Sequence, residues 1–198
     1  RYYKIQPVKQ QIGLLFLSYL RFFARLQLAK KPYQTIVGIT GSAGKTSTVL
    51  ALEAALKPNL TVKTSLSGGN SESGLPLSIL DLSTTDYSLL DWLRIAFLAP
   101  LKLLTNWSKF DVFIAEMGID APTPPKNMAY LLSIIKPDIG IFLNVSPVHQ
   151  QFFSSLDQIA QQKAKLANTA TTAIINLSDP LVRKYTTNKH QIPISNQK

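Results

Sequence analysis

The 198-residue sequence has no cysteine and only two histidines, His149 and His190. A disulfide scaffold, a zinc ribbon and a thiol nucleophile are therefore excluded, and so is a metal site built from several histidines. Glutamate is also scarce, with three residues at positions 53, 72 and 116. A scarce carboxylate in an unusual setting is a candidate functional group.

Acidic residues are outnumbered, since 11 Asp and Glu stand against 21 Lys and Arg, for a net charge of +10. This balance suggests a polyanionic partner, which could be a phosphate compound, a nucleic acid or an anionic membrane surface. The composition is otherwise that of a globular protein, with 45% hydrophobic residues, 12 Pro and 9 Gly. The length suits one substantial domain with a short appendage.

Long apolar runs and a secretory signal are missing as well. The run Ile12–Leu20 is too short to span a bilayer, and Arg21 and Arg25 follow it at once. Because the chain starts at Arg1 without a Met and stops in polar sequence, we expect it to be part of a longer protein.

Residues 1–34 are basic and rich in aromatic and leucine residues, in a pattern that predicts a helix ending before Pro32. Two interpretations of this segment stay open. The helix could pack on the rest of the domain, or it could lie in the surface of a membrane.

From residue 35 onward, apolar strands alternate with helices. This alternation predicts an α/β fold, a mostly parallel sheet with helices on both faces. The Gly-containing turn Gly41–Thr46 after the first strand makes the expected fold P-loop NTPase-like. We therefore place a second unit at 35–198. The expected strands are 35–40, 61–64, 111–116, 138–145 and 172–177, and the expected helices are 47–56, 86–106 with a break at Pro100, 127–135, 155–167 and 180–186.

A phosphate-binding loop is predicted between the first of these strands and the next helix. Its glycines let backbone N–H groups turn toward phosphate oxygens, and the helix N-terminus adds its positive end. Lys45 would contact the β- and γ-phosphates, and the Thr46 hydroxyl could bind Mg²⁺. The common form of the loop has a glycine where Ile39 stands, so this loop is a shorter variant; the alternative is an ordinary turn with a surface lysine. The predicted ATP-binding residues are Gly41, Ser42, Ala43, Gly44, Lys45, Thr46 and Ser47.

Three further residues are candidates for the same crevice. Glu116 ends an apolar strand, where a carboxylate could hold Mg²⁺, although it could also cap a helix or form an ion pair. His149 follows another strand and could be a ligand, but a lone histidine is more often structural. Lys163 lies in a helix, and on its own it would be taken for a solvated surface residue.

Taken together and in this order, the motifs resemble the central ATP-binding domain of the Mur ligases over roughly residues 35–187. Within that family the resemblance is to the ligases that add D-Ala-D-Ala to a UDP-MurNAc-peptide. The stretches that carry it are Thr40–Ser47, Asn70–Pro76, Ala115–Gly118, Asn144–His149 and Ala160–Leu166.

The resemblance implies an ATP-dependent amide ligase of peptidoglycan precursor synthesis that acts through an acyl phosphate, with ATP and Mg²⁺. It implies catalytic roles for Lys45, His149 and Lys163, and substrate contacts from Asn70 and Glu72. Thr46, Glu116, His149 and Lys163 would bind metal, the lysine after carbamylation by CO₂. It also implies that the segment 1–34 stands where the family has an N-terminal UDP-binding domain, and that a C-terminal domain would follow Lys198.

Other functions stay open at this point. One is another Mur or folylpolyglutamate-type ligase, and another is an ATP-binding module that hydrolyses ATP without forming an amide. A third is an adaptor that contacts a membrane through 1–34 and 86–106. We expect UDP-MurNAc-peptide and D-Ala-D-Ala as substrates, no nucleic-acid partner, and a place in the cytoplasm or at the inner membrane surface; the oligomeric state stays open.

Overall fold

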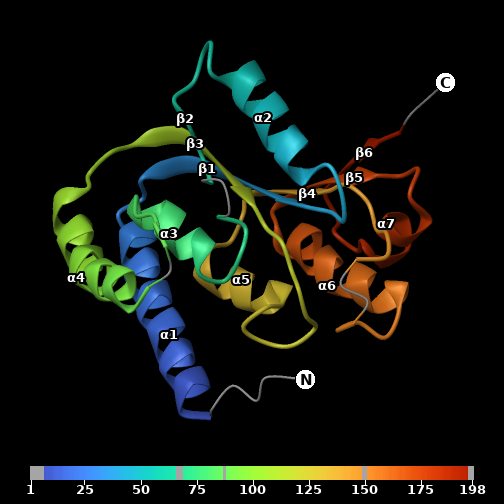
Figure 1. Ribbon diagram of the computed structural model, residues 1–198. Coiled ribbons are helices and arrows are strands. Elements are labelled where there is room, and N and C mark those ends of the chain that lie inside the picture. Colours follow the sequence, from blue (N-terminus) through green and yellow to red (C-terminus); the bar gives the residue numbers. More distant parts are fainter. Residues whose placement is uncertain (1–6, 66–68, 87, 149–150, 196–198) are drawn as a thin grey trace.

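The computed structural model describes residues 7–65, 69–86, 88–148 and 151–195 (Figure 1). The elements are, in chain order, α1 (Pro7–Ala29), β1 (Tyr33–Thr40), α2 (Lys45–Leu56), β2 (Val62–Thr64), α3 (Gly74–Leu80), α4 (Leu89–Thr105), β3 (Phe110–Glu116), α5 (Met128–Ile134), β4 (Ile139–Phe142), α6 (Leu156–Thr169), β5 (Thr172–Asn176), α7 (Pro180–Tyr185) and β6 (Gln191–Ile194).

The strands described form one sheet in the order β2-β3-β1-β4-β5-β6, and every pairing in it is parallel. Helix α2 lies on one face, and α1, α3, α5 and α6 lie on the other (Figure 1). The predicted α/β fold with helices on both faces is therefore confirmed. The helices do not cover the whole sheet, because Ile192 and Ile194 of β6 are exposed at its edge.

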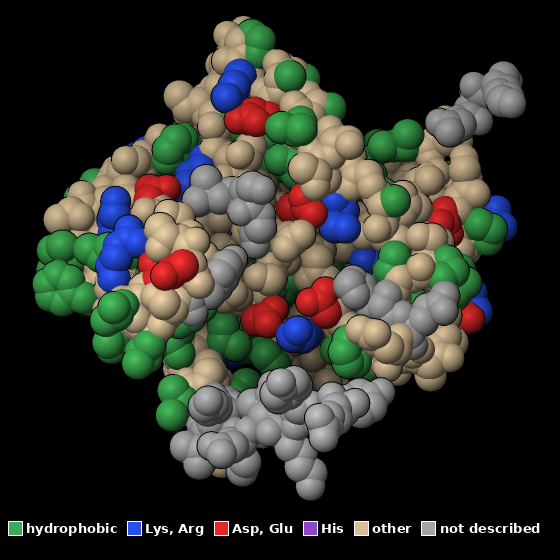
Figure 2. Space-filling view, in the orientation of Figure 1, with side chains coloured by type: hydrophobic (Ala, Val, Ile, Leu, Met, Phe, Trp, Pro, Cys, Tyr) green, Lys and Arg blue, Asp and Glu red, His purple; other side chains and the backbone are tan. Residues whose placement is uncertain are grey.

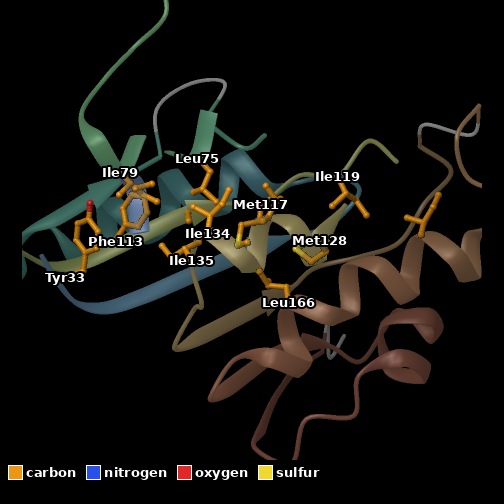
Figure 3. Close-up of a cluster of buried hydrophobic side chains, with 14 of the residues drawn as sticks. Tyr33, Leu75, Ile79, Phe113, Met117, Ile119, Met128, Ile134, Ile135 and Leu166 are labelled. Carbon is orange, nitrogen blue, oxygen red and sulfur yellow. The ribbon is translucent and has the colours of Figure 1, made fainter. Parts of the chain in front are cut away.

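The main core lies beneath the sheet, between its central strands and the helices α1, α3, α5 and α6. Phe113 of β3 and Met117, just beyond it, meet Ile79 of α3, Met128 of α5 and Leu166 of α6 in one cluster (Figure 3). The Phe113 side chain is buried because β3 lies between β2 and β1, and because helices α1, α3, α5 and α6 cover this face of the sheet. The continuous apolar pattern of the strand follows from burial on both faces.

Two elements were not predicted. Helix α3 contains Gly74 and Pro76, which lower helix propensity, but its residues 75–80 are all buried, so tertiary packing outweighs that preference. Strand β6 contains Pro193, which is tolerated because β6 lies at the edge of the sheet.

The prediction that Pro100 breaks its helix is wrong, because α4 continues from Leu89 to Thr105 with Pro100 inside it. Proline lacks the N–H that would bond to the carbonyl oxygen of Ala96. That oxygen instead accepts a hydrogen bond from the Tyr19 hydroxyl of α1, at 2.5 Å. The freed carbonyl therefore keeps a partner, and α1 is joined to α4 at the same point.

Helix α6 approaches β4 so closely that position 140 has room only for glycine. A Cβ atom on Gly140 would lie 2.9 Å from Ala170 Cβ and 3.1 Å from both Ala167 Cα and the Leu166 carbonyl oxygen. Two of these three neighbours are backbone atoms, which cannot rotate out of the way.

We predict that Gly140→Ala lowers the free energy of unfolding by about 1–3 kcal/mol, the usual cost of overpacking. The measurement is urea unfolding followed by circular dichroism. Gly13→Ala is the matched control: apart from the neighbouring backbone of its own helix, no atom lies within 4 Å of the added Cβ, and alanine in a helix is favoured by up to about 1 kcal/mol. Equal stability of the two variants would contradict the close packing of α6.

Candidate functional site

The predicted phosphate loop lies at the carboxyl edge of the sheet, between β1 and α2 (Figure 1). Gly44 caps α2 with a φ of 80°, a left-handed conformation that favours glycine. The first N–H groups of α2 have no acceptor within the helix, and they point into this edge. The loop therefore has the local geometry that binds an anion.

Asn144, just beyond β4, fixes the shape of the loop. Its Oδ1 accepts the backbone N–H groups of Ser42 at 3.1 Å and Ala43 at 2.9 Å, and its Nδ2 donates to the Ala43 carbonyl at 3.1 Å. The Ser42 hydroxyl donates to the Ser146 carbonyl at 3.1 Å and accepts the Ser146 N–H at 2.9 Å. The N–H groups of Ser42 and Ala43 are thus engaged, which leaves those at the start of α2 as the donors available to an anion.

A short hydrogen-bonded chain joins the loop to β3. The Thr46 hydroxyl donates to Glu116 Oε2 at 2.8 Å, and Asn70 Nδ2 donates to Glu116 Oε1 at 3.1 Å. The backbone N–H of Glu116 donates to the Ser65 hydroxyl at 3.1 Å. The carboxylate is therefore held beside the loop by two side chains from separate segments.

This pair of hard oxygen donors fits Mg²⁺. The described residues contain no cluster of three or more His, Asp or Glu that could hold a metal by itself. Mg²⁺ does not need one, because it is commonly held by one or two carboxylates together with substrate phosphates and water. Thr46 and Glu116 could supply the protein's share.

A buried lysine lies under the same loop. Lys163 of α6 is only 2% exposed, and its Nζ donates to the Gly41 carbonyl oxygen at 2.9 Å. Lys45 Nζ donates to that same oxygen at 3.1 Å. Burial, together with the nearby Lys45 ammonium group, lowers the pKa of Lys163 to about 7, against a smaller opposing effect of Asp120. Near neutral pH, a substantial fraction of Lys163 is therefore in the neutral amine form.

The two lysines open into a small cavity of about 110 Å³. Asn70 and Glu72, predicted as substrate contacts, line it as well, and so does Asp120, which sequence reasoning missed. His149 lies outside the described residues, although its neighbour Val148 lines the cavity. The structure thus brings Lys45, Lys163, Asn70 and Glu72 together, next to the Thr46–Glu116 pair.

Asn144, Ser65 and Asp120 had no sequence signal of their own as site residues. Asn144 belongs to a stretch that was noticed, Asn144–His149, but its role depends on a contact about one hundred positions away in the chain. Ser65 and Asp120 follow β2 and β3, so only the parallel order of the strands brings them to the site.

The sequence model of a family described as the Mur ligase middle domain matches residues 39–197. The chain belongs to the Mur ligase family. The resemblance inferred from the motifs is therefore confirmed.

Relatives within the Mur ligases are similar over most of this chain. The UDP-N-acetylmuramoyl-tripeptide–D-alanyl-D-alanine ligase of Mycobacterium tuberculosis (strain H37Rv) is 32% identical over 152 residues, which are 75% of this chain and 24% of that protein. The ligase of the same name from Rickettsia prowazekii is 27% identical over 163 residues, 81% of this chain and 30% of that one. The chain therefore spans about a quarter to a third of the length of these relatives.

Solved structures show the same fold. The MurF ligase from Thermotoga maritima, in complex with ADP, superposes with a TM-score of 0.70 at 27% identity, over 92% of this chain and 37% of that one. E. coli FolC, in complex with DHPP and ADP, gives a TM-score of 0.56 at 16% identity, over 88% and 46%. At that identity the FolC likeness concerns the fold alone.

We predict that Glu116→Gln lowers the affinity for ATP in the presence of Mg²⁺ by about tenfold, corresponding to about 1.4 kcal/mol. The amide keeps the shape and can still accept a hydrogen bond from Thr46, but it removes the charge that would attract the cation. Titration calorimetry with and without Mg²⁺ measures this, and affinity without Mg²⁺ should change little.

Glu53→Gln is the matched control, because Glu53 pairs with Lys57 at the far end of α2. It should leave both affinities unchanged. If Glu116→Gln showed the same Mg²⁺ dependence as the unmodified protein, Glu116 would have only a structural role.

Proposed function

We propose that this chain is the ATP-binding part of a ligase that joins D-Ala-D-Ala to a UDP-MurNAc-tripeptide in peptidoglycan precursor synthesis. The names of the relatives support this assignment, and so does the ADP bound in the Thermotoga neighbour. The structural observation that supports it most is the buried position of Lys163 beside the Gly41 carbonyl oxygen. A plain ATP-hydrolysing module would use Lys45, Thr46 and Glu116, but it would have no need of a second, buried lysine on the Gly41 carbonyl.

The reaction transfers the γ-phosphoryl group of ATP to the terminal carboxylate of the peptide. A carboxylate oxygen attacks the γ-phosphorus as the bond to ADP breaks, and an acyl phosphate results. The amine of D-Ala-D-Ala then attacks the acyl carbon, and inorganic phosphate leaves as the amide forms. The difficulty is the negative charge gathered around the phosphoryl group.

Each residue of the site would help to bind or neutralise that negative charge. The Lys45 ammonium would contact the β- and γ-phosphates, and the N–H groups at the start of α2 would bind the remaining phosphate oxygens. Asn144 keeps the loop in the shape that presents them. Mg²⁺, when bound by Thr46 and Glu116, would neutralise further phosphate charge. Asn70 and Glu72, which line the same cavity, would contact the acceptor substrate.

Lys163 has a separate role in this proposal. An ammonium group there would repel Lys45 and any bound metal, whereas a carbamate would reverse the sign of the charge and add two oxygen donors. Carbamylation requires a neutral amine attacking CO₂, and the lowered pKa of Lys163 makes that amine available. With His149, the carbamate would complete the metal-binding side of the site. Lys165 is not equivalent, since its Nζ donates to Gln162 at 3.0 Å.

The domain assignment is also part of the proposal. Residues 35–198 form the ATP-binding unit, and the segment 1–34 contributes the helix that packs beside it. We place this unit in the cytoplasm, where UDP-linked precursors and ATP are found together. Because the chain spans about a quarter of the length of relatives such as the M. tuberculosis ligase, we expect it to bind nucleotide but not to form the amide alone.

The test is an amide-forming assay with the complete gene product, ATP, Mg²⁺, a UDP-MurNAc-tripeptide and D-Ala-D-Ala, with product detected by mass spectrometry. We predict ligation that falls at least about 100-fold in Lys163→Ala and stays within about twofold in Lys165→Ala. Labelled bicarbonate should give a carbamate carbon signal in the Lys165→Ala protein but not in Lys163→Ala. Since the neutral amine becomes more abundant through a pKa of about 7, the signal should grow from about pH 6 to about pH 8.

Three results would contradict the assignment in different ways. Preference for a single amino acid over D-Ala-D-Ala would point to another Mur or folylpolyglutamate-type ligase. Phosphate release without amide would point to an ATP-hydrolysing module. A fully active Lys163→Ala, or an inactive Lys165→Ala, would refute the role given to Lys163.

A further inference from the structure

Helix α4 has two apolar faces, and only one of them is used inside the domain. Ile95 and Ala99 are fully buried against α1 and α3, together with Leu20, Leu77 and Leu80. On the opposite face a second apolar set is exposed: Leu90, Leu93, Phe97, Leu101 and Leu104. At about 100° per residue these five lie within an arc of about 80°, with no polar residue at its centre.

This exposed set, which we call the outer face of α4, is large for a surface helix. Phe97 is 73% exposed and Leu104 is 72% exposed. Figure 2 shows hydrophobic side chains gathered on the side of the molecule where α4 lies. Large contiguous apolar patches of this kind mark interaction surfaces.

Helix α1 extends the apolar surface. A groove of about 640 Å³ runs between α1 and α4, and Ile12, Leu14, Leu17, Leu89 and Leu93 are among its lining residues. Within the described residues, Gln11–Ala29 is the one stretch long and apolar enough to cross a membrane by length and composition.

The packing of α1 in the domain argues against α1 crossing a membrane. Leu20 and Ala24 are buried in the domain, and the Gln27 side chain donates to the Asn106 carbonyl at 3.1 Å. With the Tyr19 bond to Ala96, these contacts hold α1 along α4. The two helices therefore present one apolar surface that can lie on a bilayer rather than pass through it.

The charges around this surface are positive. The sequence has no Asp or Glu before Glu53. Among the described residues, cations lie at the C-terminal ends of both helices and just beyond them: Arg25, Lys30, Lys31, Lys102 and Lys109.

Two acids on and beside α4 are paired, and Asp111, two positions after Lys109, accepts hydrogen bonds from Thr61 at 2.6 Å and Gln34 at 3.1 Å. Asp91 is buried and accepts from Arg94 at 3.1 Å, and Asp81 is paired with Lys63 and Asn106. Asp86 remains exposed before the start of α4 and accepts the N–H of Ser88 at 3.0 Å. The balance at the edge of the patch therefore favours an anionic partner.

Trp107 lies where the apolar and the basic parts meet. Its indole N–H donates to the Leu104 carbonyl at 2.9 Å, and the Lys30 Nζ lies 4.2 Å from the centroid of its ring. A half-polar aromatic side chain beside lysines is typical of the membrane–water interface.

We propose that the outer face of α4, together with the groove beside α1, docks this domain on a bilayer surface that contains anionic lipids. A second copy of the chain is the competing occupant, which light scattering would reveal as a dimer. The proposal does not depend on the ligase assignment, since it concerns a surface formed by α1 and α4 and not the phosphate loop.

The experiment is co-sedimentation of the full chain with vesicles of phosphatidylcholine, with and without one quarter phosphatidylglycerol. We expect binding to the anionic vesicles that weakens several-fold at high salt, because the electrostatic part is screened. Phe97→Asp should lower the partition coefficient by at least about tenfold, since it places a charge in the apolar face. Leu50→Asp is the matched control: Leu50 is 60% exposed on α2, which covers the other face of the sheet, and binding should stay within about twofold.

A second variant, Lys109→Glu, leaves the apolar face intact and should weaken binding to anionic vesicles only. Circular dichroism checks that each variant is folded. The proposal is overturned if the chain does not sediment with anionic vesicles, or if Phe97→Asp and Leu50→Asp behave alike. It is also overturned if light scattering shows a dimer that Phe97→Asp dissociates, because a second copy would then occupy the face.

Discussion

The close packing of α6 against β4 decides where the second lysine of the site stands. Gly140 allows the helix backbone to approach the sheet, and α6 then reaches the edge where β1 ends. From that position Lys163 can donate to the Gly41 carbonyl while it stays almost completely buried. A larger residue at position 140 would move the helix and, with it, the amine on which the ligase assignment depends.

The parallel sheet brings the other residues of the site together. Strands β1, β3 and β4 are neighbours, so the residues that follow them meet at one edge although they are far apart in sequence. Thr46, Glu116 and Asn144 come together for this reason. Local patterns can identify the phosphate loop and the acid that ends β3. The identity of Asn144 as the residue that shapes the loop depends on strand order, which no local pattern contains.

Local sequence patterns failed to predict particular features of the fold. The positions of most helices and strands follow from apolar periodicity, but α3 forms in spite of Gly74 and Pro76 because it is buried. Pro100 remains within α4 because Tyr19, from a distant segment, bonds to the carbonyl that proline leaves free. Lys163 looks like an ordinary surface lysine on a helix, and only the fold shows that it is buried. In each case a long-range contact outweighs a local preference.

In the proposed function the loop between β1 and α2 binds the phosphates of a nucleotide, and titration calorimetry with Mg·ATP tests this binding directly. The loop contributes one lysine side chain, so Lys45→Ala should weaken binding by about 10- to 100-fold, the range expected for losing a charge-assisted hydrogen bond. Lys57→Ala, which removes a lysine at the other end of the same helix, should leave the affinity unchanged. Equal affinities of the unmodified protein and Lys45→Ala would show that this loop does not bind the phosphates.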